Sequence, residues 1–272
     1  MVIVVFIVGG LISFLRLGYL EQGVPKYDIS TWVEQNKIEK VLIVFAHQDD
    51  ELLVSGSLAG LNAAGIKTSL LTLTNGDGER RSESVSIESL IKERKKELEA
   101  VAELLGIDTL EQGFFSDQGF MDVTDSEIKP IILERIRSFH PDTIITWDTE
   151  KGLYGHPHHV RVARLAIEIC NENKMDPAFP VKAVYSSTVS VWIREALKKL
   201  SPMYQRRYYE ISKGESIEPT FSLATSEFAD YRRSAFAVYV KRGAVQGLNP
   251  LSGAPKVIED FVFDREYFYQ SY

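Results

Sequence analysis

The chain has 272 residues, of which 44% are hydrophobic, and this is enough to bury one substantial core. Its 38 acidic and 31 basic residues give a formal net charge of −7 without a Lys/Arg-rich block, which argues against nucleic acid as a partner. The single cysteine, Cys170, excludes an internal disulfide and any site built from several thiolates. Histidines and carboxylates must therefore hold any metal ion.

Residues 1–20, MVIVVFIVGGLISFLRLGYL, form a mostly apolar run with no charge before Arg16. A membrane span needs about 20 apolar residues and a signal-peptide core about 7–15, so the run falls between the two classes. Because no Lys or Arg precedes it and no A-x-A-like cleavage site follows, a membrane anchor is favoured over a cleaved signal or a buried first strand. Arg16 and Lys26 would leave the following domain on the cytoplasmic side, whereas cleavage would make it secreted or periplasmic.

After a connector at residues 21–38, predicted strands and helices alternate along the chain. Such alternation is typical of βαβ units and predicts a single α/β domain over residues 39–272, Rossmann-like, three-layered and with a mostly parallel sheet. The aromatic-rich tail, residues 261–272, is expected to form an edge strand. The other strands are expected at 41–46, 68–74, 143–147 and 182–189, and helices at 51–64, 89–105, 125–139, 158–173 and 227–240.

Two loops, each after a predicted strand, hold four of the five histidines. They are His47-Gln48-Asp49-Asp50 and Tyr154-Gly155-His156-Pro157-His158-His159. A His and an Asp from the first loop and a His from the second would give three ligands and an open position, as a catalytic zinc requires. Asp49 would then lie beside the ion as a candidate base for its water.

Each loop alone has a structural explanation. The acids of the first loop are typical of a helix N-terminus, and Pro157 fits the first turn of a helix. The two loops together, in a chain with few histidines, favour the metal site.

The first loop also carries a family resemblance. Ala46-His47-Gln48-Asp49-Asp50-Glu51 resembles the A-H-P-D-D-E strand end of zinc-dependent N-deacetylases. This family includes N-acetylglucosaminyl-phosphatidylinositol deacetylase, LmbE-like proteins and the deacetylases of mycothiol and bacillithiol synthesis. His156 and His159 resemble its later H-x-x-H. The resemblance covers roughly residues 40–167 and is poor in the C-terminal third.

The resemblance implies three zinc ligands: His47, Asp50 and His159. It also implies that Asp49 is the general base and that His156 stabilises the oxyanion or protonates the leaving amine, with Tyr154 assisting at the oxyanion. Arg94 and Asp117 are implied substrate contacts, although a solvated arginine on a helix face is the alternative for Arg94. The same ligand set can accept Fe²⁺, Mn²⁺ or Co²⁺.

Two residues depart from the family pattern. Gln48 replaces the usual proline and so removes a fixed φ from the loop. His158 stands where many members have an Asp that can hold the oxyanion histidine in one tautomer. The acid role of His156 is therefore in question unless Asp148 or another carboxylate substitutes.

The sequence thus predicts a zinc-dependent hydrolase that removes the N-acetyl group from an N-acetylglucosamine-containing glycolipid, glycan or sugar conjugate. An anchor at residues 1–20 would favour a lipid-linked substrate and membrane association. The alternatives are an amidase acting on a larger sugar-amide conjugate and a catalytically silent carbohydrate- or metal-binding protein.

Overall fold

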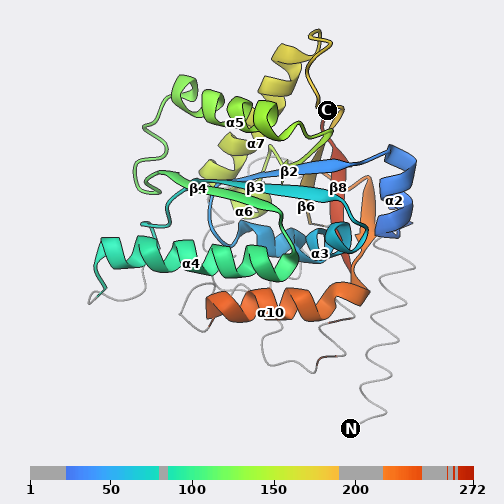
Figure 1. The fold of residues 1–272 in the computed structure, drawn as a ribbon, viewed down its shortest axis with the longest axis horizontal. Helices are drawn as coiled ribbons and strands as arrows, with labels where there is room; N and C mark the ends of the chain where they lie inside the picture. Colours follow the sequence, from blue (N-terminus) through green and yellow to red (C-terminus); the bar gives the residue numbers. More distant parts are fainter. Residues whose placement is uncertain (1–22, 80–84, 190–216, 241–255, 257–259, 261–262) are drawn as a thin grey trace.

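The computed structural model describes residues 23–79, 85–189, 217–240, 256, 260 and 263–272 (Figure 1). In this part of the chain one eight-stranded sheet has the order β1-β7-β8-β6-β5-β2-β3-β4. The strands are β1 (Lys26–Tyr27), β2 (Lys40–Phe45), β3 (Lys67–Thr74), β4 (Thr109–Phe115), β5 (Thr143–Trp147), β6 (Ala183–Thr188), β7 (Phe221–Ala224) and β8 (Arg265–Gln270).

Most neighbouring strands run parallel. Strands β6, β5, β2, β3 and β4 form a continuous parallel set, β1 is parallel to β7, and only β8 runs antiparallel to its neighbours β6 and β7. The predicted α/β class with a mostly parallel sheet is confirmed.

Helices cover both faces of this sheet (Figure 1). On one face lie α5 (Asp125–Phe139) and α7 (Pro157–Asn173), and on the other lie α3 (Ser55–Ala63) and α4 (Ile87–Leu105). The helix α10 (Ala229–Val240) packs against α3 and α4 as a further cover. The chain therefore builds three main layers, as expected.

Strand β2 shows why the apolar run in the sequence is continuous. Val41, Ile43 and Phe45 belong to the core beneath α3 and α4, whereas Leu42 and Val44 belong to the core beneath α5 and α7. All are fully buried, since helices cover both sides of the strand. The apolar run thus fixes β2 at the centre of the domain, and its end is where the polar loop begins.

Several elements differ from the sequence prediction. The stretch predicted as a connector contains β1 and α2 (Ile29–Asn36), because Trp32 is buried and stacks on Phe221 of β7. The predicted helix at 51–64 starts as a 3₁₀ turn, η2 (Asp50–Val54), and only then becomes α3. The tail is not an edge strand, because β8 is paired on both sides.

The predicted membrane anchor at residues 1–20 lies outside the described residues. Among the residues that are described, no helix combines the length and the apolar character needed to cross a bilayer. Anchoring therefore stays a prediction from the sequence.

Glu266 of β8 provides a pH test of the packing between the sheet and α3. Its carboxylate accepts hydrogen bonds from the backbone N–H groups of Gly56 and Ser57, each at 2.8 Å. Burial nevertheless raises the pKa of Glu266 from 4.5 to about 7, although these hydrogen bonds oppose the rise. The folded chain then holds this proton more tightly than the unfolded chain, so the stabilisation is complete below about pH 4.5 and is lost as the pH rises toward 7.

We expect the unfolding free energy of the protein to fall between pH 5 and 7 relative to that of Glu266→Gln, which cannot ionise. Denaturant unfolding followed by circular dichroism at several pH values measures both. Parallel pH profiles for the two proteins would contradict this assignment.

Candidate metal centre

The two polar loops meet at the carboxyl ends of β2 and β5. These strands are neighbours, and the chain proceeds from β2 to β3 and β4 on one side but from β5 to β6 on the other. The strand order therefore reverses between β2 and β5. Open α/β sheets bind ligands at such a reversal point.

Three side chains converge there. His159 Nε2 lies 3.0 Å from His47 Nδ1 and 3.0 Å from Asp50 Oδ1, and His47 Nδ1 lies 3.7 Å from Asp50 Oδ1. Asp50 and His159 are buried, and His47 is partly exposed. The sequence-predicted ligand set is thus brought together as a group that could hold a metal ion.

The chemistry of these donors fits a cation. His159 Nδ1 lies 2.9 Å from the carbonyl oxygen of Gly152, which can only accept, so the neutral ring carries its proton on Nδ1. The Nε2 of this ring faces Asp50 Oδ1 at 3.0 Å, where a positive charge is needed between the two atoms, either a proton on the ring or a bound cation. A divalent ion meets that need, and the backbone contact holds the ligating nitrogen in the correct tautomer.

Asp50 is held so that only one oxygen faces the histidines. Its Oδ2 accepts hydrogen bonds from the backbone N–H of Ala46 at 3.0 Å, from that of His47 at 2.9 Å, and from Trp147 Nε1 at 3.0 Å. Burial opposes ionisation of Asp50, but His159 and His47 hold its pKa well below the usual range. The group is therefore a carboxylate with Oδ1 free to bind a cation.

Trp147 was not predicted as a site residue. Its indole ring stacks on His159 with a centroid separation of 4.5 Å and an interplanar angle of 4°, so it contacts two of the three candidate ligands. Its position as the last residue of β5 is the only signal in the sequence that could have suggested this.

We expect Trp147→Phe to weaken metal binding by about 10–100-fold, as is typical when an outer partner of a ligand is lost. Phenylalanine keeps an aromatic ring beside His159 but removes the N–H that holds Asp50. Competition with a chromophoric chelator measures the affinity, and Trp32→Phe, in the core beside β7, is the matched control. Equal affinities for the two variants would show that the indole N–H has no such role.

Asp49 lies beside this group in an unusual backbone conformation. Its φ of 98° is in the left-handed region, which Asp and Asn tolerate better than most residues. Its Oδ2 lies 3.1 Å from Arg94 Nη2. Burial raises the pKa of Asp49 to about 6, although the positive charge of Arg94 opposes the rise. Asp49 can therefore be an ionised proton acceptor near neutral pH.

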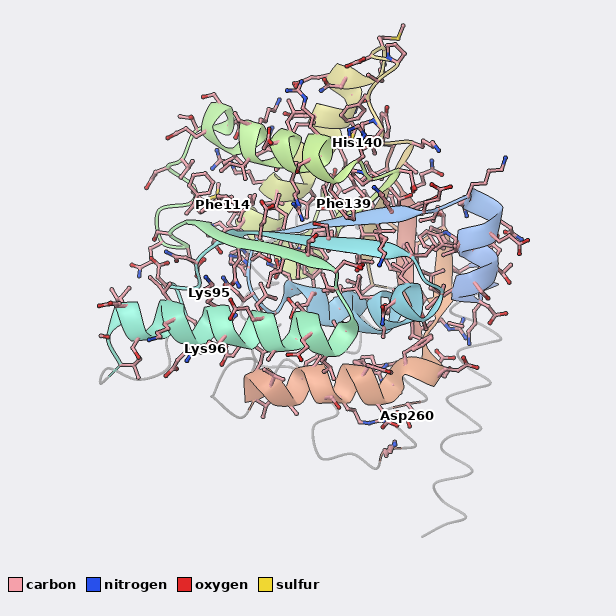
Figure 2. The ribbon with its side chains drawn as sticks, viewed as in Figure 1. Lys95, Lys96, Phe114, Phe139, His140 and Asp260 are labelled. Atoms are coloured by element: carbon pink, nitrogen blue, oxygen red, sulfur yellow. The ribbon has the colours of Figure 1, made fainter. Side chains whose placement is uncertain are left out.

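Arg94 is buried, so the solvated-arginine alternative is wrong. Its exposed fraction is 3%, and it ion-pairs with Asp49, with Glu79 at 3.2 Å and with Glu97 at 3.1 Å. The neighbouring Lys95 and Lys96 are exposed on α4 (Figure 2). Arg94 thus supports the loop that carries Asp49, and its predicted contact with a substrate stays a prediction.

Glu51 and Tyr239 form a second support that the sequence did not reveal. Glu51 is fully buried, and its carboxylate accepts hydrogen bonds from Tyr239 Oη at 2.7 Å and from the backbone N–H of Asp49 at 3.0 Å. Burial raises the pKa of Glu51 to about 8. The helix α10, far along the chain, is thereby connected to the Asp49 loop.

The second loop places His156 and His158 opposite His47. His156 caps α7, and its Nδ1 accepts a hydrogen bond from the backbone N–H of His158 at 3.3 Å. Burial, together with the neighbouring histidines, lowers the pKa of His156 to about 2 and that of His158 to about 4. Both rings are therefore neutral, and with Nδ1 accepting, the proton of His156 lies on Nε2.

Residues 42–170 match the family model described as GlcNAc-PI de-N-acetylase, PIG-L. We refer to this matched segment, residues 42–170, as the PIG-L domain. The chain is 28% identical over 179 residues to a 1D-myo-inositol 2-acetamido-2-deoxy-alpha-D-glucopyranoside deacetylase of Streptomyces griseus, a match covering 57% of this chain and 55% of that protein.

A second relative is the probable N-acetylglucosaminyl-phosphatidylinositol de-N-acetylase of Schizosaccharomyces pombe. It is 28% identical over 162 residues, which cover 57% of this chain and 61% of the relative. The match therefore spans little more than half the length of these two proteins.

Among solved structures, the N,N'-diacetylchitobiose deacetylase of Pyrococcus horikoshii superposes with a TM-score of 0.65. The sequence identity is 18%, and the match covers 96% of this chain and 91% of that one. At this identity the likeness establishes the fold, and it extends beyond the segment that the family model matches.

In this PIG-L domain, Gln48 makes a hydrogen bond that compensates for the missing proline. Its buried side-chain Nε2 donates to the carbonyl of Thr74 at 2.8 Å, which ties the loop after β2 to the end of β3. A side-chain hydrogen bond thus restrains the loop that carries the candidate ligands.

The remaining predicted residues of the PIG-L domain lie around the site. Asp148 accepts backbone hydrogen bonds from Glu150, Lys151 and Leu153 and so shapes the second loop. Tyr154 lies in α6 (Gly152–Gly155), and its side chain is outside the described part. Asp117 accepts from the backbone N–H of Gly78 at 2.9 Å. Burial opposes protonation of His47, but Asp50 above all, with a further contribution from Asp117, raises its pKa. The predicted roles of Tyr154 and Asp117 stay predictions.

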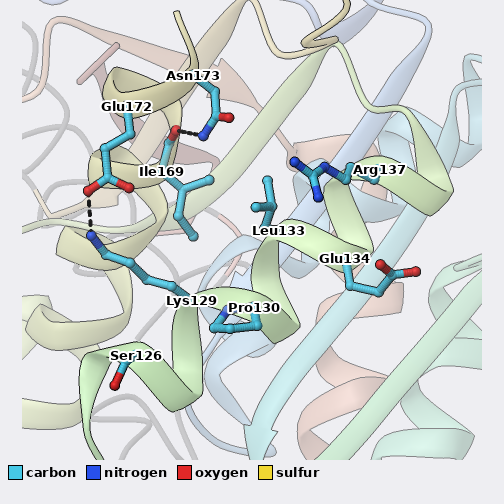
Figure 3. Close-up of a pocket in the computed structure, with 9 residues that line it drawn as sticks. All are labelled: Ser126, Lys129, Pro130, Leu133, Glu134, Arg137, Ile169, Glu172 and Asn173. Atoms are coloured by element: carbon cyan, nitrogen blue, oxygen red, sulfur yellow. Dashed lines mark hydrogen bonds and ion pairs between the residues drawn. The ribbon is translucent and has the colours of Figure 1, made fainter.

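A groove of about 400 Å³ lies away from this site, between α5 and α7 (Figure 3). Its lysine, Lys129, is paired with Glu168 at 3.0 Å and with Glu172 at 2.6 Å. The groove holds none of the residues that converge at β2 and β5, so we assign the chemistry to the histidine site.

Proposed function

We propose that this chain is a metal-dependent N-deacetylase that removes the acetyl group from an N-acetylglucosamine-containing substrate. The observation that supports this most strongly is the convergence of His47, Asp50 and His159 beside the separate carboxylate of Asp49. The named relatives act on N-acetylated amino-sugar compounds, which supports the same substrate class.

Zinc is the ion that we propose for the three ligands. Two imidazole nitrogens and one carboxylate oxygen form a common set for a catalytic zinc, although Fe²⁺, Mn²⁺ or Co²⁺ could bind the same residues. When bound, such an ion would lower the pKa of a water molecule and polarise the acetamide carbonyl.

The side chains of this protein supply the proton transfers. Asp49 is placed to accept a proton from the attacking water, while Arg94 holds its carboxylate in position. The Nε2–H of neutral His156 can donate to the oxyanion that develops on the carbonyl oxygen. Because His156 is neutral and needs its proton for that hydrogen bond, we assign protonation of the leaving amine to Asp49. The C–N bond breaks, and acetate and a free amine result.

The experiment is acetate release from a panel of N-acetylglucosaminyl compounds by metal-stripped protein, with and without added zinc. We expect release only with the metal, and we expect the best substrate to identify the acceptor. Zinc binding without release from any member would contradict deacetylation and would favour a larger amide conjugate or a binding protein.

We also propose that residues 1–20 hold the domain at a membrane on the cytoplasmic side and that the substrate is lipid-linked. The support is the apolar character of this run in the sequence. Fractionation of the full chain and of a chain without these residues tests it. Equal recovery of both proteins in the aqueous fraction would contradict the proposal.

A further inference from the structure

We propose that the partly exposed part of the site contains a second metal position, formed by His47, His156 and His158. Each of these histidines offers a ring nitrogen, and the three nitrogens lie within 4.8 Å of one another. The position is distinct from the first because it contains no carboxylate and lies at the other ring nitrogen of His47.

His47 separates the two positions. Its Nδ1 lies 3.0 Å from His159 Nε2, whereas its Nε2 lies 2.9 Å from His158 Nδ1. The two ring nitrogens of an imidazole point in different directions, so one histidine can face two ions. A neutral imidazole has one free lone pair, and holding both ions therefore releases the ring proton of His47 to solvent.

The three rings are already arranged around a common point. The ring centroids are 4.7 Å apart for His47 and His156, 5.1 Å for His47 and His158, and 4.7 Å for His156 and His158. Imidazole nitrogens suit Zn²⁺, Cu²⁺ and Ni²⁺. Since this set lacks the negative charge of Asp50, we expect it to bind zinc more weakly than the first set.

Neighbouring groups hold the two outer histidines in place. The ring of His158 lies edge-on to the buried ring of Phe120 at a centroid distance of 5.1 Å. His156 is fixed by its place as the N-cap of α7, directly before Pro157. Coordination by His156 would use the Nδ1 lone pair that now accepts a hydrogen bond from the backbone N–H of His158.

An ion at this position would have a functional consequence, which rests on the proposed function. It would engage His156, the residue that we assign to the oxyanion. We therefore expect excess zinc to inhibit acetate release, and we expect His158 to be the residue that makes the protein sensitive to it.

The test is a titration of the metal-stripped full chain with zinc. Binding is measured by calorimetry and by competition with a chromophoric chelator. We expect two equivalents to bind, the second more weakly. His158→Asn should lower the affinity for the second zinc ion by more than about 100-fold. The loss of a direct ligand costs more affinity than the 10–100-fold that is typical when an outer partner of a ligand is lost. His156→Asn should do the same. His140→Asn, at the exposed end of α5, is the matched control for adventitious histidine binding (Figure 2).

The outcomes separate this inference from the proposed function. A single equivalent that is lost in Asp50→Asn but unchanged in His158→Asn would overturn the second position and leave the first intact. A second equivalent that His140→Asn removes as well would also overturn it. Absence of any bound zinc in the natural sequence would overturn the metal-dependent function itself.

Discussion

Replacing Asp49 with Asn is expected to lower the kcat of acetate release by about 10²–10⁴-fold while the protein still binds its metal. Asparagine has nearly the same shape and tolerates the left-handed backbone with φ of 98°. Its amide oxygen can still accept the hydrogen bond from Arg94. It cannot take up a proton, and so the step assigned to Asp49 is the one that is lost.

Two measurements are needed for this prediction, the rate of acetate release and the metal content of the purified variant. Asp122→Asn, the same substitution at an exposed position, is the control and should keep the full rate. If Asp49→Asn retained its metal and more than about a tenth of the rate, another group would have to be the base.

Arg94→Met is expected to lower the free energy of unfolding by about 3–5 kcal/mol, the usual range when one partner of a buried ion pair is removed. Arg94 ion-pairs with three carboxylates, of which Glu97 is fully buried. Its guanidinium also lies 5.0 Å from the ring of Tyr239. Methionine fills a similar volume but leaves these negative charges without that cation.

Denaturant unfolding of metal-free protein measures this effect apart from metal binding. Lys95→Met and Lys96→Met are matched controls, because they make the same change on the exposed side of the same helix (Figure 2). We expect both to change the stability by less than about 0.5 kcal/mol. A loss in Arg94→Met no larger than in these controls would show that the ion pairs contribute little.

The elements predicted best were those with strong local signals. Helix α5 was predicted with its observed bounds, closed before Pro141, and the structure shows a capping box between Thr124 and Glu127 at its start. Strand β5 was also predicted correctly from a short β-rich run. Strands β4 and β7 were missed, since one is a partly exposed edge strand of mixed polarity containing Gly113 and the other has four residues.

The candidate ligands could be predicted because both loops follow strands that lie next to each other in the sheet. Their supports could not be, since Trp147 and Tyr239 meet the first loop only through tertiary packing. Arg94 is an intermediate case. It lies on the same face of α4 as the buried residues Leu90, Leu98 and Val101, and this helical spacing was a signal that it is buried.

The hydrogen bond from Tyr239 to Glu51 limits how far this chain can be truncated from its C-terminal end. The segment that matches the family model ends at residue 170, whereas Tyr239 lies on α10, well beyond it. A fragment trimmed to the recognisable segment would leave the Glu51 carboxylate without its hydroxyl donor. The smallest fragment that keeps the geometry of the Asp49 loop must therefore extend through α10. The segment that matches the family model is thus shorter than the segment that must fold together.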